Sequence, residues 1–475
     1  MADITKFNGY NLKDKQLRED ILETKMYLGY TDENVIGLLA DFENNTFTRL
    51  GGAVGKSAGE DFNVYNMYGN RKVCAVQDDG TISKWWGEDG YVEDGSIGQI
   101  MVRQPKFYYK VVPLKLAPIE PDDTDQSDTE GYYLKKVNYY ISDSPPPGFK
   151  VHPAFIGRDG TEKDCYYIGS YEASLWDASE NEYRKYDTWD VSESGGVYTI
   201  NAFNTYLADV ENDKLCSIAG VKPASSEYSV QFKRFDTNTM GENRGSKWGS
   251  INVKILSAEQ MLFAIEFGTF NTQTSIQNGV THYDAGTHDE SVFTGSTSSL
   301  GNGIGAAASS SRLVSDGTYE TNTNNGYKSV RYRGVENFWG NVWAYVSGIN
   351  IWGNGKMGGG EAYICDDFDF AESKNDGNYK PVGFTLPYRN GGYYKYFGYS
   401  ATHDWIFLPA GRSLSTSVSM IGDVVYSENK TNSYKITYIG GSWSNTTLCG
   451  GFTLNIRNGI DTRGRHIGSR LIYID

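Results

Sequence analysis

Positive charge and long apolar runs are scarce in this chain. Its 475 residues include 44 Lys and Arg against 59 Asp and Glu, which gives a formal net charge of −15. Nucleic acids and anionic membrane surfaces bind clustered positive charge, so this balance argues against both as general partners. There is no run of about 18 apolar residues, so we expect no membrane insertion. The opening MADITKFNGY has no apolar core of a secretory signal peptide.

Cysteine is also rare. The five cysteines are scattered, odd in number and free of any CxxC pair: Cys74, Cys165, Cys216, Cys365 and Cys449. This pattern excludes a zinc ribbon and argues against a disulfide scaffold. We expect most of these thiols to be small buried apolar groups.

Aromatic residues and glycine, in contrast, are abundant. The chain has 36 Tyr, 10 Trp and 55 Gly but only 12 Pro. Many short strand-like segments separated by Gly, Asn, Asp and Ser turns predict a β-rich α+β fold. Tyrosine is typical of rigid amphipathic contact surfaces. Because β-rich folds also use tyrosine for packing, composition leaves both interpretations open.

The chain divides into three regions by pattern. Residues 1–30 contain a charged helical stretch whose Leu17, Ile21, Thr24 and Leu28 share one face. Such a seam serves oligomerisation or attachment to a neighbouring protein, or packs on its own domain. We expect a β-rich region over residues 31–150 and a large C-terminal domain over residues 151–475.

One further helix has clear sequence signals. Ser257 and Gln260 have the spacing of a capping box, apolar residues follow at helical spacing, and Gly268 marks the end. The stretch after this helix, residues 269–325, is rich in Ser, Thr, Asn and Gly. We expect long exposed loops there.

Several enzyme motifs occur in the wrong context. GKSAG at residues 55–59 has nucleophile-elbow spacing but no preceding apolar strand and no following helix. GNGKMG at residues 353–358 matches a dinucleotide pattern but lacks the helix that would bind pyrophosphate. THYDAGTHDE and CDDFDF are best explained as polar loops, with bound cations left open. The residues predict no catalytic centre.

Five stretches, in order, resemble the C-type-lectin-like fold shared by formylglycine-generating enzymes and phage receptor-binding proteins. They are YIGSYEAS at Tyr167–Ser174, LSAEQMLFAIEFG at Leu256–Gly268, ENFWGNVWAYVSG at Glu336–Gly348, GGSWSN at Gly440–Asn445 and IGSRLIYI at Ile467–Ile474. Upstream, GQIMVRQPKFYYKV, GFKVHPAF and the N-terminal ITKFNGYNLKDKQLRE resemble segments of phage tail and fibre proteins. The resemblance implies a C-type-lectin-like domain with long loops.

The resemblance covers two functions that cysteine content separates. Formylglycine-generating enzymes carry two cysteines after the closing tryptophan, which bind copper and oxidise a substrate cysteine. Here that segment contains Cys449 alone. The activity is therefore not carried over, and a receptor-binding protein fits better. In some phages a diversity-generating retroelement varies the contact residues of this segment.

The same resemblance implies a set of ligand contacts. Gly440, Gly441 and Trp443 would frame one end and Gly468 the other, and strand alternation would point the side chains between Phe452, Leu454 and Ile456 outward. The ligand-binding residues expected on this basis are Trp443, Ser444, Asn445, Thr446, Thr447, Thr453, Asn455, Arg457, Asn458, Asp461 and Arg463, with Tyr394 and Tyr396 from a nearby aromatic segment.

These observations predict a non-enzymatic phage tail-fibre or tail-tip protein, made in the bacterial cytoplasm and carried on the virion. Its partners would be a bacterial surface receptor, either protein or glycan, and other tail proteins, and a homotrimer is the favoured assembly. The alternatives are a tail-adaptor or capsid-decoration protein without receptor binding, and third an oxidase of the formylglycine-generating type. We expect no cofactor, but related folds leave a structural calcium near Asn337 and Asn341 open.

Overall fold

The computed structural model describes most of the chain after residue 32, together with a short N-terminal hairpin. The described residues are 6–7, 10–11, 33–121, 128–184, 189–194, 197–203, 208–224, 232–281, 291–309, 312–313, 319–320, 327–353, 360–388, 391–413, 421–427, 431–464 and 466–475. The hairpin pairs β1 (Lys6–Phe7) with β2 (Tyr10–Asn11). The amphipathic helix predicted within residues 1–30 otherwise lies outside the described residues.

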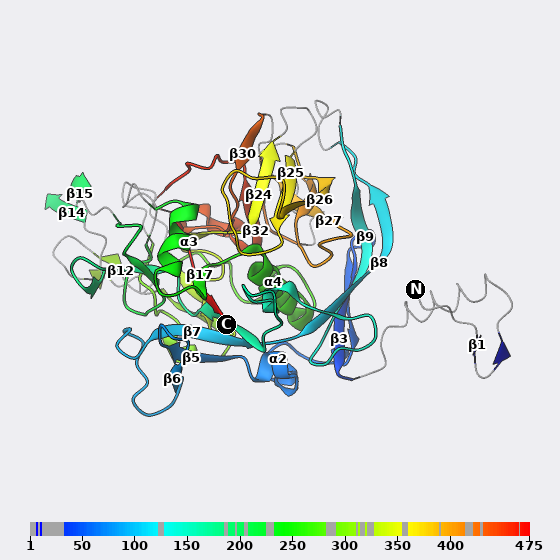
Figure 1. Ribbon diagram of the computed structural model, residues 1–475, viewed down its shortest axis with the longest axis horizontal. Coiled ribbons are helices and arrows are strands. Elements are labelled where there is room, and N and C mark those ends of the chain that lie inside the picture. The colour runs from blue at the N-terminus through cyan, green and yellow to red at the C-terminus, as the bar shows by residue number, and fades with distance from the viewer. Residues whose placement is uncertain are drawn as a thin grey trace.

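The prediction of a β-rich α+β chain is confirmed. Several sheets, mostly antiparallel, surround one long helix, α4 (Val253–Phe267), which lies at the centre of the molecule (Figure 1). One hydrophobic cluster runs through the molecule from Ile36 to Ile474. In the part of the chain that the structure describes, no helix is long and apolar enough to span a bilayer.

The largest sheet has seven strands and joins distant parts of the chain. Its strands are β3 (Val35–Asp41), β4 (Thr46–Gly51), β8 (Tyr108–Pro118), β9 (Tyr132–Ser142), β10 (Lys150–Val151), β27 (Tyr393–Tyr399) and β28 (Pro409–Ser413). Gly398 on β27 pairs with Tyr133 on β9. Strands from both sides of residue 150 therefore share this sheet.

A six-stranded sheet also crosses residue 150. In spatial order its strands are β17 (Trp248–Ser250), β34 (Leu471–Ile474), β11 (Cys165–Gly169), β7 (Gln99–Pro105), β5 (Lys72–Val76) and β6 (Ile82–Trp85). Strand β7 ends at Pro105. Strand β34 lies inside the sheet, where Ile472 pairs with Ile168 on one side and Gly249 on the other.

The remaining strands form smaller sheets. A five-stranded sheet contains β29 (Val425–Ser427), β32 (Gly450–Ile456), β31 (Tyr438–Gly440), β23 (Trp343–Tyr345) and β33 (Ile467–Gly468), with β29–β32 and β23–β33 parallel. A four-stranded sheet contains β26 (Tyr379–Thr385), β25 (Gly360–Cys365), β24 (Ile349–Gly353) and β30 (Ser433–Lys435). The others are β12 (Ser174–Asp177), β13 (Glu182–Tyr183), β16 (Lys214–Cys216), β14 (Trp189–Ser194), β15 (Val197–Phe203), β18 (Gly305–Ala308), β19 (Arg312–Leu313), β20 (Tyr319–Glu320), β21 (Lys328–Tyr332) and β22 (Val335–Glu336).

Helix α4 begins earlier than the capping-box pattern predicts. Asn252 caps it, because its side-chain oxygen accepts from the backbone N–H groups of Lys254 and Ile255 at 3.0 and 3.1 Å. The predicted start at Ser257 is wrong, since that residue lies inside the helix. The predicted end is confirmed, with Gly268 left-handed at φ 68°.

The other helical elements are short. They are η1 (Glu60–Val64), α2 (Asn66–Gly69), η2 (Pro153–Phe155), α3 (Arg234–Glu242), α5 (Thr272–Ser275), η3 (Ser298–Leu300) and η5 (Trp443–Leu448).

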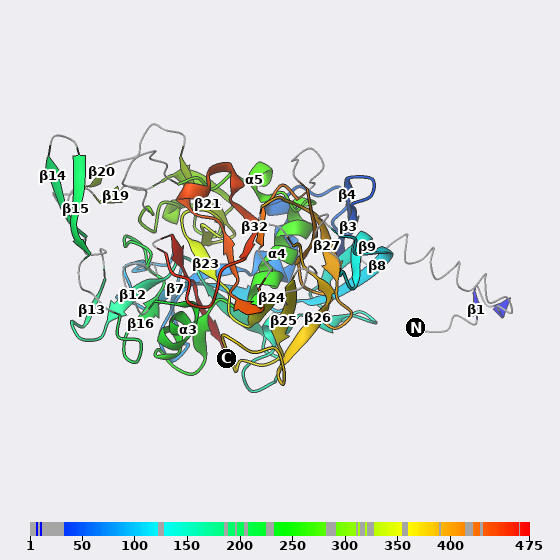
Figure 2. The same cartoon turned by 90° about the horizontal axis from the view of Figure 1, so that it is seen from above.

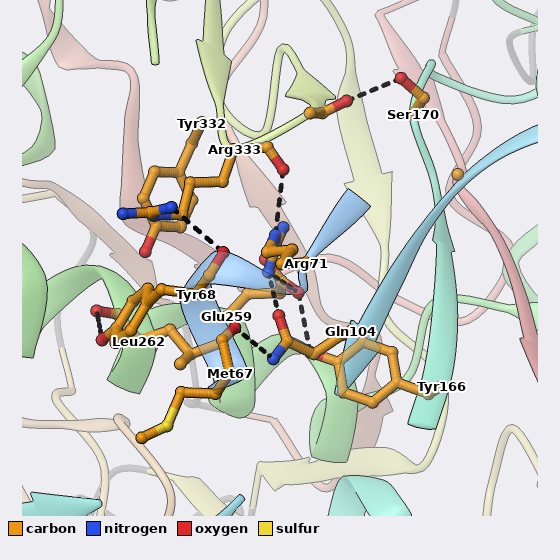
Figure 3. Close-up of polar contacts among 12 residues, drawn as sticks. Met67, Tyr68, Arg71, Gln104, Tyr166, Ser170, Glu259, Leu262, Tyr332 and Arg333 are labelled. Carbon is orange, nitrogen blue, oxygen red and sulfur yellow. Dashed lines mark hydrogen bonds and ion pairs between the residues drawn. The ribbon is translucent and has the colours of Figure 1, made fainter. Parts of the chain in front are cut away.

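Buried ion pairs tie α4 to the residue before β5 and to the turn after β21 (Figure 3). Glu259 binds the guanidinium of Arg71 at 2.7 Å, and neither side chain is exposed. Two turns later Glu266 binds Arg333 at 2.6 Å and accepts from the Tyr332 hydroxyl at 2.9 Å. A helix buried on all sides keeps charged groups only when they are paired, and these two pairs meet that condition.

The expectation of long exposed loops over residues 269–325 is wrong for a described part of that stretch. Val292, Phe293 and Thr297 are buried. The hydroxyl and N–H of Thr297 donate to Glu336 at 2.6 and 2.7 Å. Small polar residues therefore form buried hydrogen bonds here, which composition alone cannot distinguish from loop chemistry.

Candidate functional site

The C-terminal segment expected to bind a ligand starts on a buried frame. Gly440 and Gly441 have φ angles of 99° and 82°, which favour glycine. A Cβ on Gly441 would lie 2.6 Å from the sulfur of Cys449. Trp443 is 2 % exposed, so it belongs to this frame. The expectation that Trp443 contacts a ligand is therefore wrong, because a covered indole has no free face for a ligand.

Strand β32 is buried along its whole length. Thr453 and Asn455 are 0 % and 5 % exposed, so the expectation that they point outward is wrong. The reason is that both faces of β32 are covered: Phe452 packs against distant aromatic rings on one face, and η5 lies against the other. The Thr453 hydroxyl donates to the carbonyl of Leu448 at 2.9 Å, and the Asn455 side-chain oxygen accepts from the N–H of Arg457 at 3.2 Å.

Other members of the expected set do lie at the surface. The side chains of Ser444 and Thr446 lie outside the described residues. The partly or fully exposed members are Asn445, Thr447, Arg457, Asn458, Asp461, Arg463 and Tyr396. Apart from Tyr396, all of them sit on η5, which leads into β32, or on the segment that follows β32.

A tyrosine that the sequence did not single out, Tyr426, contacts two of these residues. The guanidinium of Arg457 lies 5.8 Å from the ring centre of Tyr426, and the amide of Asn445 donates to its hydroxyl at 3.4 Å. Burial raises the pKa of Tyr426, so the phenol is neutral at physiological pH. The amide of Asn458 donates to the Tyr438 hydroxyl beside it. We call Tyr426, Tyr438, Asn445, Arg457 and Asn458 the Tyr426 cluster.

The segment after the cluster is also held in place. Asp461 forms an ion pair with Lys233 at 2.7 Å, and this hydrogen bond lowers the pKa of the Asp461 carboxyl. The hydroxyl of Tyr345 donates to the carbonyl of Thr462 at 2.8 Å. Arg463 is exposed on the same segment. This surface therefore presents both signs of charge beside an aromatic ring.

The two tyrosines expected from the nearby aromatic segment lie elsewhere. Tyr394 is 1 % exposed, so the expectation that it contacts a ligand is wrong. The pairing of β27 with β28 shifts register between Tyr394 and Tyr396, so simple alternation does not hold, and Tyr394 packs in the core. Tyr396 is partly exposed and stacks on Tyr133 with ring centres 4.1 Å apart. It belongs to the seven-stranded sheet, whereas the Tyr426 cluster belongs to the five-stranded sheet.

Cys449 has the environment of a packed thiol. It is fully buried, and its sulfur donates to the carbonyl of Ser442 at 3.1 Å. Burial raises the pKa of this thiol, which keeps it protonated at neutral pH. A thiolate is the form that binds metal or attacks a substrate, so this environment disfavours both roles.

The residues near the expected calcium position do not fit a cation. The side-chain amides of Asn337 and Asn341 donate to Glu172 at 3.2 and 2.6 Å, and the N–H of Val342 donates to the same carboxyl at 3.0 Å. The Asn341 oxygen accepts from the Thr281 hydroxyl at 3.0 Å. Donors occupy the position where calcium needs oxygen ligands. Burial raises the pKa of Glu172 to about 8.

The other candidate metal loops give no site. All of THYDAGTHDE except its first threonine lies outside the described residues. The same holds for residues 354–359, which include all of GNGKMG except its first glycine. In CDDFDF, Asp367 accepts from the N–H of Asp369 at 2.9 Å and from the amide of Asn378 at 2.8 Å, as in a polar turn. Within the described ranges, no group of three or more His, Cys, Asp or Glu residues could hold a metal ion.

Sequence reasoning missed Tyr426 and Tyr438 because their position depends on long-range pairing. Tyr426 pairs with Asn455 in a parallel register, and Tyr438 pairs with the same residue in an antiparallel register. A parallel pair joins distant segments and leaves no local turn signal. The alternating pattern in SYKITYI was the available signal for Tyr438.

Comparison with known proteins gives distant structural matches only. No protein-family model matches the chain, and no curated protein matches its sequence. Two solved structures align with 85% of the chain at 13% identity. They are the Major Tropism Determinant U1 Variant, with a TM-score of 0.25 over 71% of that chain, and the Major Tropism Determinant P3c Variant, with a TM-score of 0.24 over 72% of that chain. Similarity this low identifies no functional residue in the present chain.

Proposed function

We propose that this chain is a non-enzymatic phage tail-fibre or tail-tip protein that binds a bacterial surface receptor. The observation that carries the proposal is the Tyr426 cluster, in which partly exposed polar groups surround a neutral tyrosine on a buried strand frame. Tyrosine and arginine are the residues that dominate protein contact sites. The receptor-binding surface comprises the four partly exposed members of the Tyr426 cluster, without the buried Tyr438, together with Thr447, Asp461 and Arg463. In this proposal residues 151–475 form the C-type-lectin-like domain.

The division between frame and surface supports diversification of the contact residues. Phe452, Leu454 and Ile456 are buried in the core, whereas Thr447 and Arg463 are exposed. Substitutions at exposed positions away from special backbone features change the free energy of unfolding by about 0.5 kcal/mol or less. A retroelement that varied only the exposed positions would therefore change the ligand without unfolding the domain.

Assembly would strengthen binding at this surface. Linked copies raise the effective concentration of each site, so weak single contacts give tight attachment. We propose a homotrimer joined to other tail proteins through residues 1–30. Sedimentation analysis of the full chain, with and without those residues, tests this assembly, and a monomer in both forms would contradict it.

Adhesion to bacteria tests the receptor proposal directly. Fluorescently labelled full-length chain is mixed with a panel of bacterial strains, and bound fluorescence is measured. Arg457→Ala and Asn458→Ala should weaken adhesion about tenfold each, since contacts at the centre of a binding site contribute about 1–2 kcal/mol. Lys72→Ala and Asp89→Ala, at exposed positions on other elements, serve as matched controls and should bind like the unmodified chain.

The outcomes separate the alternatives. Unchanged adhesion of both cluster variants would contradict the site. Absence of adhesion to every strain, combined with incorporation into tails or capsids, would favour the structural virion alternative. Oxidation of a cysteine-containing peptide in the presence of copper would contradict the non-enzymatic assignment.

A further inference from the structure

Strands β12, β13 and β16 lie at one end of the molecule, near β7 (Figure 2). Residues of these four strands and of nearby segments line a polar cleft. The cleft is open to solvent and has a volume of about 400 Å³, and small-ligand pockets typically span about 300–1,000 Å³. Its lining comes from the turn after β5, the segment before β7, the four strands named above and the segment after α3. No residue of the proposed receptor-binding surface lines it.

Two aromatic rings contribute an apolar wall. Trp176 and Tyr183 pack edge to face, with ring centres 4.7 Å apart and planes at 76°. The Tyr183 hydroxyl donates to the carbonyl of Gly95 at 3.1 Å and accepts from the amide of Gln99 at 3.2 Å, so its position is fixed. Trp176 is partly exposed. An exposed indole beside a cavity offers the flat apolar surface on which a sugar ring packs.

Charged groups line another part of the cleft. Both carboxylate oxygens of Asp78 are engaged, one by Arg244 at 2.5 Å and the other by Lys214 at 3.3 Å. Arg244 also donates to the sulfur of Cys216 at 2.9 Å and is nearly buried. Among the residues that line the cleft, two cations therefore face one carboxylate, which leaves these lining residues with one positive charge. The Lys214 side chain is 33% exposed and has further N–H donors.

We propose that this cleft binds a sugar that carries an acidic group, such as a uronic acid. The pyranose ring packs on Trp176, and the acidic group pairs with the ammonium of Lys214. Gln77 and Asn181 are exposed lining residues whose amides reach sugar hydroxyls. An acidic ligand compensates the surplus charge, which a neutral sugar leaves unpaired. The inference rests on the cleft alone and is independent of the receptor-binding surface.

Calorimetry and saturation-transfer NMR on the full-length chain test the proposal. The probes are trigalacturonate and the neutral sugar galactotriose. The unmodified chain should bind trigalacturonate about tenfold more tightly than galactotriose, because one charge pair in a partly enclosed site contributes about that factor. Trp176→Ala should weaken binding of both probes about tenfold through loss of ring packing. Lys214→Gln should abolish the preference for the acidic probe and leave galactotriose binding unchanged.

The chain provides a matched control for the tryptophan. Trp352 is also partly exposed and packs against a tyrosine, Tyr434, with ring centres 4.7 Å apart, but it lies on β24. Trp352→Ala should bind both probes like the unmodified chain. Failure of trigalacturonate to bind at millimolar concentration would overturn the proposal, and so would equal affinity for the two probes. If Trp176→Ala fails to fold, Lys214→Gln still decides the outcome.

Discussion

Replacing Glu259 with glutamine removes one charge of a fully buried ion pair. Glu259 accepts from the two terminal nitrogens of Arg71 at 2.8 and 2.7 Å and from the hydroxyl of Tyr166 at 2.7 Å. Glutamine keeps the shape of the side chain but turns an N–H group toward the guanidinium. Arg71 stays buried and charged without a partner of opposite charge (Figure 3).

The expected loss follows from this geometry. Removing one partner of a buried pair lowers the free energy of unfolding by about 3–5 kcal/mol. Arg71 also donates to Gln104 at 2.8 Å and to the carbonyl of Arg333 at 3.0 Å, so it is held away from water. Because the total stability of a protein is about 5–15 kcal/mol, Glu259→Gln should be severely destabilised.

A double variant separates charge compensation from packing. Arg71→Met with Glu259→Leu removes both charges but leaves polar groups of Tyr166 and Gln104 without partners, at about 1–3 kcal/mol each. We expect the double variant to lose less free energy of unfolding than the sum of the losses of the single variants Arg71→Met and Glu259→Leu.

Urea unfolding, followed by tryptophan fluorescence and circular dichroism, measures these differences. Lys106→Met is the control, because Lys106 pairs with the more exposed Glu162 and Asp164 and should contribute less than about 1 kcal/mol. A loss for Glu259→Gln no larger than that of the control, or additive single losses in the double variant, would refute this reasoning.

Three further predictions concern the frame of the proposed receptor-binding surface. Burial raises the pKa of Asp423 to about 8, so the folded chain holds a proton that the unfolded chain releases near pH 4, and the free energy of unfolding falls as the pH rises toward 8. Asp423→Asn should therefore make the fall in urea midpoint between pH 5 and pH 8 shallower. An unchanged slope of the urea midpoint against pH would contradict this. Gly441→Ala should lower the free energy of unfolding by about 1–3 kcal/mol, because its φ of 82° disfavours a side chain, and an unchanged melting temperature would show that the turn does not require glycine. Phe452→Ala should lower the free energy of unfolding by about 3–5 kcal/mol, whereas Thr447→Ala should lower it by no more than about 0.5 kcal/mol. Equal unfolding midpoints of the two variants would contradict the division between frame and surface.

Local patterns predicted the existence of elements better than their limits. The apolar spacing around Met261 and the glycine at position 268 correctly predicted helix α4 and its end. Its start depends on Asn252, whose role as a cap is visible only once the helix is known to continue upstream of Ser257. Two capping patterns competed, and packing on all faces of the helix selected the longer one.

The candidate site shows the limit of strand alternation. Alternation correctly separated Phe452 from Thr453 by face, but it could not show that both faces of β32 are covered. One face is covered by aromatic residues that are distant in sequence, such as Phe270 and Phe397, and the other by η5. The exposed residues Arg457 and Asp461 follow the end of the strand, where burial by neighbouring strands stops.

The position of β34 has a consequence for biosynthesis. Strands β7 and β11 leave the ribosome early, yet the edge of β11 acquires its second neighbour only when residues 471–474 have been made. Chains still being translated therefore expose an unpaired strand edge, which is a site for aggregation. Premature termination before Leu471 would yield chains in which the edge of β11 stays open. Such chains should be retained by chaperones or degraded. Incorporation into assemblies is then restricted to chains that have been translated through β34.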